Sequence, residues 1–220
     1  DMGMLAKNGD QKSMPAASVV KIVTALVVLN KKPLSLGEKG PTLTLGPADV
    51  AIYNKYYRLD GSVVLVKSGE KITEYEALEA MLLPSANNMA ESLVLWPSRS
   101  TQAYLAEANS YVKSLGLADT HLADASGFSA KSVSSAHDLV KLGLQAMSNP
   151  VIAQITAKAQ ATIPVAGKIH STNWLLGTDN IVGIKTGNTT QAGGCFLFAA
   201  NVAKGPYKTT IVGAIMGASD

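Results

Sequence analysis

Cysteine and histidine are scarce in this sequence, which limits the metal and redox chemistry that it can support. Cys195 is the only cysteine among 220 residues, so no internal disulfide can form and no cysteine cluster is available for a metal. The three histidines share no metal-ligand spacing, and we expect them to be structural or exposed; they are His121, His137 and His170. The sequence therefore predicts no metal site and no cofactor.

Charged residues are also scarce. They make up 16% of the sequence, the formal net charge is +3, and the basic residues are scattered lysines with only two arginines. Because nucleic-acid sites gather basic side chains on one face, this composition argues against a nucleic-acid partner. The apolar content of 47% predicts an ordered globular protein, either one large domain or two small ones.

No apolar run is long enough to cross a membrane, which takes about 20 residues. The apolar stretch 19–29 is interrupted only by Lys21 and Thr24, and it is too short. No signal peptide is recognisable either. If the protein is exported, we expect its targeting segment to have been removed, and any membrane anchor to lie in segments absent from this sequence.

The same stretch predicts a buried helix that carries a reactive pair. Ser13 is suited to cap this helix and Pro15 to lie in its first turn, and residues 19–29 leave no polar face. Ser18 and Lys21 are three residues apart, so their side chains project from one face. A hydroxyl near a helix start beside a desolvated amine is the arrangement of a serine nucleophile activated by lysine.

Two further short motifs complete a candidate active site. Residues 85–87, Ser-Ala-Asn, follow a helix that is broken at Pro84, and residues 185–187, Lys-Thr-Gly, lie in a predicted strand. Each motif alone is weak, because similar patterns recur at Ser68 and Lys71, at Ser110 and Lys113, at 171–173 and at 67–69. Only the first set combines a buried helix start, a loop between helices and a strand. In the alternative interpretation, Lys21 reaches solvent, Ser85 caps a helix and 185–187 is an edge strand.

The catalytic roles follow from the chemistry of these side chains. Ser18 would attack a carbonyl group while a neutral Lys21 takes its proton. Neutrality at pH 7 requires the pKa of Lys21 to fall by about 3 units from about 10.4, at a cost of roughly 4 kcal/mol. Desolvation and a nearby cation, for which Lys185 is the candidate, lower a lysine pKa. Ser85 is a candidate proton relay to the leaving group.

The remaining candidates are expected to bind substrate. Asn87 would position it by amide hydrogen bonds, and Gly187 would let its backbone approach closely because no side chain intervenes. The N–H groups of Ser18 and Asn188 are expected to form an oxyanion hole, in which losing one donor typically costs about 10²–10³ in rate.

Helices are expected mainly in the middle of the sequence and strands at its end. Expected helices cover 73–83, behind a capping box of Thr73 and Glu76, and 88–95, 100–115 and 135–147. Expected strands cover 4–8, 63–66, 162–165, 181–186, 195–202 and 209–216, with 34–48 as loop. This order predicts an α/β protein of the α+β type, an antiparallel sheet flanked by helices. Its sheet part would be 1–32 and 150–220, with a mainly helical insertion at 33–149.

With these motifs in place, the sequence resembles a known family, the low-molecular-weight D-alanyl-D-alanine carboxypeptidases among the penicillin-binding proteins. The resemblance covers nearly the whole chain, through segments 15–18, 24–26, 83–88, 110–117, 120–121, 125–128, 134–139, 173–176 and 183–193. It implies a β-lactamase/DD-peptidase-like fold, with Ser18 as acylated nucleophile, Lys21 as base, Ser85 and Asn87 as second element, and Lys185 and Thr186 at the substrate's terminal carboxylate. It also implies a serine DD-peptidase that removes the terminal D-alanine of peptidoglycan stem peptides, is inhibited covalently by β-lactam antibiotics, and works outside the cytoplasm, in the cell envelope or secreted.

The sequence departs from this family in three respects. Ala86 replaces a frequent glycine. Thr172 stands where some members have an arginine, which leaves carboxylate binding to Lys185 and Thr186. Members usually continue into a final helix and often a β-rich second domain, so we expect this sequence to be a fragment.

Two rival functions stay open, a serine β-lactamase and a non-catalytic penicillin-binding sensor. A class A β-lactamase needs a loop glutamate between the second and third motifs, whereas the glutamates there, Glu91 and Glu107, fall on predicted helices. A sensor would need the site only for binding, and none of the three motifs is degenerate. The sequence does not distinguish carboxypeptidase from endopeptidase or transpeptidase activity.

Overall fold

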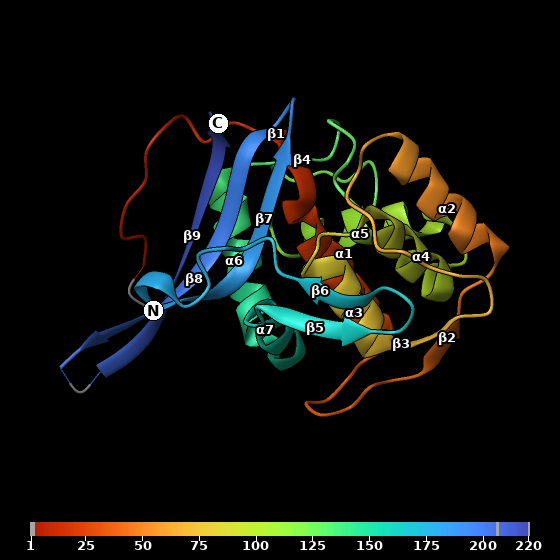
Figure 1. Ribbon diagram of the computed structural model, residues 1–220. Coiled ribbons are helices and arrows are strands. Elements are labelled where there is room, and N and C mark those ends of the chain that lie inside the picture. Colours follow the sequence, from red (N-terminus) through yellow and green to blue (C-terminus); the bar gives the residue numbers. More distant parts are fainter. Residues whose placement is uncertain (1–2, 206, 220) are drawn as a thin grey trace.

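The molecule consists of a small antiparallel sheet on one side and a group of helices on the other (Figure 1). The computed structural model describes residues 3–205 and 207–219. In chain order its elements are β1 (Met14–Pro15), η1 (Ala17–Val20), α1 (Lys21–Lys31), β2 (Thr42–Thr44), α2 (Pro47–Arg58), β3 (Lys71–Thr73), α3 (Glu74–Leu82), α4 (Asn87–Ser98), α5 (Thr101–Ser114), β4 (Val133–Ser134), α6 (Ala136–Ser148), α7 (Pro150–Thr156), β5 (Gln160–Ile163), β6 (Gly167–His170), η2 (Thr178–Asn180), β7 (Ile181–Thr189), β8 (Gly193–Lys204) and β9 (Tyr207–Ala218).

Helix α1 is the central element, as its apolar sequence predicts. All residues from Lys21 to Leu29 are buried, and the helix contacts α3, α4, α5 and α6. Within this buried stretch the polar side chain besides Lys21 is Thr24, which is satisfied internally: the hydroxyl donates to the Ala125 carbonyl at 2.7 Å and shares a hydrogen bond with the Tyr104 hydroxyl. A helix buried on every side holds the residues at its start in fixed positions.

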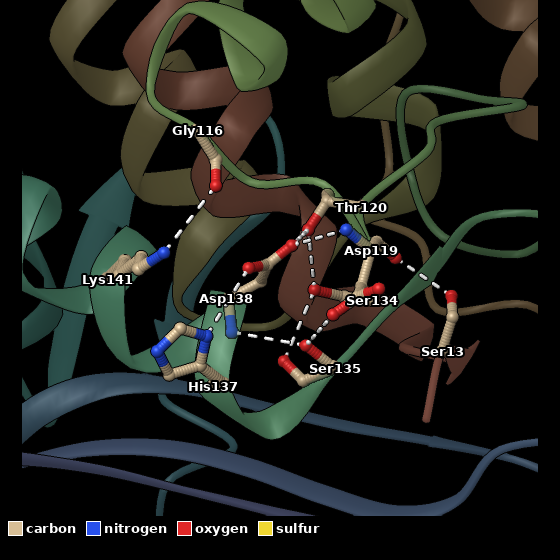
Figure 2. A network of polar contacts seen from close by, with 9 residues as sticks. All are labelled: Ser13, Gly116, Asp119, Thr120, Ser134, Ser135, His137, Asp138 and Lys141. Atoms are coloured by element: carbon tan, nitrogen blue, oxygen red, sulfur yellow. Dashed lines mark hydrogen bonds and ion pairs between the residues drawn. The ribbon is translucent and has the colours of Figure 1, made fainter. Parts of the chain in front are cut away.

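The predicted start of this helix was wrong. Ser13 is no cap, because its hydroxyl donates to the Asp119 carbonyl, as Figure 2 shows. Met14 and Pro15 form β1 and pair with β4, so the 3-10 turn η1 begins only at Ala17. A proline is compatible with this short edge strand, since such a strand does not need every N–H.

The C-terminal sheet matches the prediction closely. Strands β7, β8 and β9 form an antiparallel sheet in that order, and β5 and β6 form a separate antiparallel hairpin. Helix α6 packs against β8 and β9 and also contacts α1, so it joins the sheet to the helices (Figure 1). The fold class, an antiparallel sheet flanked by helices, is confirmed.

Two helices were missed, and both begin with a proline. In α2, Pro47 occupies the first turn and the Gly46 N–H donates to the Asp49 carboxylate at 2.7 Å. In α7, Pro150 follows the cap residue Asn149, whose side chain accepts from two N–H groups of the first turn. Proline is favoured at such positions, whereas the sequence analysis assigned 34–48 to loop and expected strands after residue 150.

Two expected strands are absent from the described residues. Residues 4–8 have no regular structure. Residues 63–66 form no strand either, because the Asn88 side chain hydrogen-bonds to the backbone of Val64. It accepts from the Val64 N–H at 3.1 Å and donates to the Val64 carbonyl at 3.0 Å. A side chain therefore takes the hydrogen bonds that a neighbouring strand would have made.

The division into a sheet part, 1–32 and 150–220, and a helical insertion, 33–149, stays a prediction. Helix α6 lies within 33–149, the range assigned to the insertion, but it packs on the sheet. The contacts of α6 therefore differ from those expected of the insertion. Among the described residues, no helix has the length and apolar character needed to cross a membrane.

Candidate active site

Ser18 and Lys21 are in direct contact at the start of the central helix. Ser18 lies in η1, just after Ala17, whose backbone φ of 46° is in the left-handed region. Lys21 begins α1 one turn further along, and its Nζ donates to the Ser18 Oγ at 2.7 Å. The spacing that predicted one shared face therefore brings the two side chains together.

Lys21 is completely buried and surrounded by oxygen acceptors. Its Nζ lies 2.7 Å from the Ser18 Oγ, from the Asn87 Oδ1 and from the Ser126 backbone carbonyl. Burial lowers the pKa of Lys21 well below its ordinary value, the positive charge of Lys185 lowers it further, and the Asp124 carboxylate opposes both. These are the two causes that the sequence analysis expected for a lysine that acts neutral.

The second motif lies in the turn between α3 and α4. Ser85 has a left-handed backbone with a φ of 64°, and its buried Oγ finds no hydrogen-bond partner among the described residues. Asn87 begins α4 and is fixed twice, since its N–H donates to the Ser62 carbonyl at 2.7 Å and its side chain accepts from Lys21. The turn therefore carries an amide, that of Asn87, which is already hydrogen-bonded, and a hydroxyl, that of Ser85, which has no hydrogen-bond partner among the described residues.

The third motif lies on β7. The buried Lys185 donates from Nζ to the Thr186 carbonyl at 2.9 Å and reaches the Thr172 Oγ1 at 3.5 Å. The hydroxyls of Thr172 and Thr186 are 2.7 Å apart. Burial lowers the pKa of Lys185 to about 7. Thr172 stands where some members of the family have an arginine. It thus belongs to the cluster expected to bind a carboxylate.

Gly187 has a packing reason that the sequence analysis did not foresee. A Cβ at this position would lie 2.8 Å from the Ser18 backbone nitrogen and 3.0 Å from the Ala17 Cβ. The missing side chain therefore lets β7 pack against the turn that holds Ser18. It also leaves the Ser18 N–H uncovered, as an oxyanion hole requires.

A cavity of about 360 Å³ opens beside the first two motifs, and the predicted site residues that do not line it are Lys21, Ser85, Lys185, Thr186 and Gly187. Ser18, Asn87 and Asn188 line it, together with residues 59–62, 127–128 and 189–191. The sequence analysis missed the 59–62 segment because it lies just after the unrecognised helix α2. The residue in this segment that could have pointed to the site is Gly61, because a Cβ there would lie 2.8 Å from the Asn87 Nδ2.

The alternative copies of the first motif are exposed, whereas Thr172, from the alternative copy at 171–173, lies beside the third motif. Ser68, Lys71, Ser110 and Lys113 are all exposed, as are the three histidines. Within the described part of the chain, no three His, Cys, Asp or Glu side chains gather in a way that could hold a metal ion.

Comparison with known proteins places this geometry in a family. The family model for Peptidase S11, D-alanyl-D-alanine carboxypeptidase, matches residues 3–219. A D-alanyl-D-alanine carboxypeptidase of Mycobacterium tuberculosis, DacB2, is 31% identical over 208 residues, which cover 91% of this chain and 67% of that protein. A D-alanyl-D-alanine endopeptidase of Pseudomonas aeruginosa is 28% identical, over 91% of this chain and 64% of that protein.

Solved structures agree on the fold. A D-alanyl-D-alanine carboxypeptidase from Mycobacterium tuberculosis superimposes with a TM-score of 0.81 at 31% identity, covering 100% of this chain and 80% of that one. The Streptomyces K15 DD-transpeptidase gives a TM-score of 0.84 at 24% identity, covering 98% and 85%. The chain belongs to the S11 family of serine-type DD-peptidases, within the penicillin-binding proteins, and spans about two thirds of the length of the first curated relatives.

Proposed function

We propose that this protein is a serine D-alanyl-D-alanine carboxypeptidase that works through an acyl-enzyme on Ser18. The observation that carries the proposal is the 2.7 Å contact between the Ser18 Oγ and the Nζ of a fully buried Lys21, whose pKa is lowered. A neutral amine in this position is a base for the hydroxyl that it touches.

In the proposed acylation step, the Ser18 Oγ attacks the carbonyl carbon of the penultimate D-alanine and its proton passes to the Lys21 Nζ. The N–H groups of Ser18 and Asn188 stabilise the resulting oxyanion. When the C–N bond breaks, the proton reaches the leaving nitrogen through the Ser85 hydroxyl. The absence of a described partner for that hydroxyl supports this role, because it is free to bridge substrate and base.

The substrate's orientation would be set by its free carboxylate. Lys185 and Thr186, assisted by the neighbouring hydroxyl of Thr172, form a cation and hydroxyl cluster that suits a chain-terminal carboxylate. Asn87 would accept or donate to the peptide from the other side of the cavity. A peptidoglycan stem peptide ending in D-alanyl-D-alanine has the required terminal group, and a β-lactam carries a comparable carboxylate beside its reactive carbonyl.

Deacylation separates this proposal from a β-lactamase. Both glutamates between the second and third motifs lie on helices and are engaged in ion pairs, Glu91 with Lys55 and Glu107 with Lys31. Neither lines the Ser18 cavity. A penicilloyl adduct would therefore lack a glutamate-held water and hydrolyse slowly, whereas a peptide acyl-enzyme loses D-alanine and makes room for water.

The experiment that tests the proposal is incubation with a pentapeptide ending in D-alanyl-D-alanine, with free D-alanine quantified, beside intact-mass measurement after penicillin. We expect repeated D-alanine release, a penicillin adduct lasting minutes on the tryptic peptide that contains Ser18, and neither in Ser18→Ala. Adduct on Ser85 or Ser110 contradicts the assignment. Rapid penicillin hydrolysis without D-alanine release supports the β-lactamase, and ligand binding with neither activity supports the sensor.

The relatives carry the names carboxypeptidase, endopeptidase and DD-transpeptidase, so product analysis has to separate these activities. Adding a glycine or D-amino-acid acceptor to the same assay distinguishes hydrolysis from transfer, and a cross-linked dipeptide substrate detects endopeptidase activity. We propose an extracytoplasmic location, because the proposed substrate is found in the cell envelope.

A further inference from the structure

The loop that supplies the third acceptor of Lys21 is organised by one carboxylate, Asp124. Its Oδ2 accepts hydrogen bonds from the Ser126 hydroxyl at 2.6 Å, from the Ser126 N–H at 3.3 Å and from the Phe128 N–H at 2.9 Å. Its Oδ1 accepts from the Ser132 hydroxyl. The Ser132 Oγ in turn accepts from the N–H groups of Ala123 and Asp124. A single side chain thus closes the turn 123–128.

This turn is fixed against the nucleophile's segment. A Cβ at Gly127 would lie 1.8 Å from the Ala17 carbonyl oxygen, so only glycine fits where the turn meets the residue before Ser18. Two successive carbonyls of the turn accept from α1: Ala125 from the Thr24 hydroxyl and Ser126 from the Lys21 Nζ, each at 2.7 Å. The turn is therefore docked along the helix that carries the base.

The geometry of a neutral amine explains why this docking matters. Such an amine has two N–H donors and one lone pair. If the two donors point to the Ser126 carbonyl and to the Asn87 Oδ1, the lone pair is left facing the Ser18 hydroxyl. The position of the Ser126 carbonyl consequently decides whether Lys21 faces Ser18 as an acceptor.

Asp124 also brings negative charge to a region of buried cations. The charged groups that act on Lys21 are Lys185, from β7, and Asp124, from this turn. Burial raises the pKa of Tyr56 of α2 and of Tyr104 of α5, and the Asp124 carboxylate raises both further. Among the described residues, Asp124 is the acidic group whose charge acts on Lys21.

We propose that Asp124 is a positioning residue for the acylation step, which builds the turn that aims Lys21 at Ser18 and supplies the negative charge that acts on Lys21. This inference rests on the proposed function, because it assigns Asp124 a role through Lys21. It is separable from a merely structural role, because a structural role has no reason to change the protonation of Lys21.

The test is the pH profile of acylation by a fluorescent penicillin in Asp124→Asn. The asparagine keeps an oxygen for the Ser126 and Phe128 N–H groups but removes the charge. Since the negative charge favours protonated Lys21, its loss should move the acid limb to lower pH by roughly half a unit to one unit. The plateau rate should fall about tenfold, because the Ser126 carbonyl is held less well.

Asp138 offers the matched control. It is buried, and its carboxylate organises the neighbouring turn by accepting from the Asp119 N–H at 2.8 Å and from the Thr120 hydroxyl at 3.0 Å, as Figure 2 shows. It is not among the groups that act on Lys21. Asp138→Asn should therefore leave the acid limb in place. Ser132→Ala, which loosens the Asp124 turn without changing charge, should lower the plateau and also leave the limb in place.

An Asp124→Asn profile that is merely scaled down, with its acid limb unmoved, overturns the proposal, as does an equal shift in Asp138→Asn. If Asp124→Asn does not fold, Asp124→Glu keeps the charge and should keep the limb while the rate falls; a shifted limb there also overturns it. Failure of the proposed function looks different, because wild-type protein would then not be acylated on Ser18 at all.

Discussion

Lys185 and Glu74 are both buried and both have a pKa of about 7, reached from opposite directions. Burial lowers the pKa of Lys185 from that of an ordinary lysine and raises the pKa of Glu74 from that of an ordinary glutamate. Lys185 lies on β7, donates to the Thr186 carbonyl and stands beside the hydroxyl pair of Thr172 and Thr186. Glu74 begins α3, under the loop around Gly40, and neither of its oxygens has a partner among the described residues.

A perturbed pKa therefore does not identify a functional site by itself. Desolvation acts on any buried charge, whereas function requires partners that orient the group and a cavity that substrate can enter. Lys185 and Lys21 meet the first requirement, and Lys21 touches two residues that line the cavity, Ser18 and Asn87. Glu74 has no hydrogen-bond partner among the described residues to orient its carboxylate, and it does not line that cavity. We therefore expect charge removal to impair activity at the lysines and to leave it unchanged at Glu74.

The largest expected effect comes from Lys21→Arg. Arginine keeps the positive charge but does not deprotonate in proteins, so it cannot take the Ser18 proton. Acylation by penicillin should fall by about 10³-fold or more while near-UV circular dichroism and the thermal transition stay close to wild type. Lys21→Met, which is also unable to act as base, should lose as much activity. A near wild-type acylation rate in Lys21→Arg means that another group is the base.

Ser85→Ala should produce the next largest effect, and it separates activity from stability. Because the Ser85 Oγ is buried without a described partner, removing it should leave the free energy of unfolding unchanged or slightly higher. If the hydroxyl relays the proton to the leaving nitrogen, D-alanine release should fall about 100-fold. Urea denaturation and D-alanine release measured on the same sample make the test. Lost stability with retained turnover would make Ser85 a structural residue.

A smaller effect is expected from titrating Lys185 in the wild-type protein. Its pKa of about 7 means that Lys185 is charged below that pH and neutral above it. Binding of a substrate carboxylate needs the charged form, so kcat/KM for a carboxylate-terminated peptide should be about tenfold lower at pH 8.5 than at pH 6.5. The carboxylate raises the pKa of Lys185 once bound, so the limb in kcat should lie at higher pH than the limb in kcat/KM.

The control for this titration is the same peptide with its terminal carboxylate amidated. The amide does not need a cation, so its kcat/KM should fall much less over the same pH range. Thr186→Val should reduce the difference in kcat/KM between the acid and the amide substrate at pH 6.5. Equal pH dependence for acid and amide means that the carboxylate is bound elsewhere.

The sequence predicted which side chains lie together better than it predicted the elements that carry them. Three side-chain motifs in the right order were enough to bring Ser18, Lys21 and Asn87 together, because each motif has a chemical signature. The helices α2 and α7 were missed because Pro47 and Pro150, which begin them, were taken as breaks. The capping box of Thr73 and Glu76 was unambiguous, and α3 follows it as predicted.

The contribution of backbone groups to the site could not be predicted from the sequence. The Ser126 carbonyl on Lys21 has no side-chain signature, because every residue has a carbonyl. Asp124 likewise looked like an ordinary loop residue, and its significance depends on where Gly127 meets Ala17. Gly187 was interpreted as leaving space for substrate, whereas its nearest constraint is the Ser18 backbone, more than 160 residues earlier in the chain.

The smallest effect on activity, and the sharpest contrast with Lys185, is expected from Glu74→Gln. The pKa of Glu74 is raised to about 7 in the folded protein, so between about pH 4.5 and 7 the folded state holds a proton that the unfolded state has lost. Stability from this group is therefore fully present below pH 4.5 and is lost as the pH rises through 7.

Glutamine stays neutral throughout, so Glu74→Gln should match wild type near pH 4.5 and be more stable at pH 8, by on the order of 2 kcal/mol. Urea denaturation at both pH values measures this, with Glu76→Gln as a control for loss of one acidic charge, since Glu76 is half-buried in the capping box of the same helix turn and glutamine also serves in a capping box. Penicillin acylation should be unchanged in Glu74→Gln. A loss of acylation would connect this end of α3 to the Ser85 turn at its other end and remove the contrast between the two buried charges; an unchanged stability at pH 8 would mean that Glu74 is already satisfied in the folded protein.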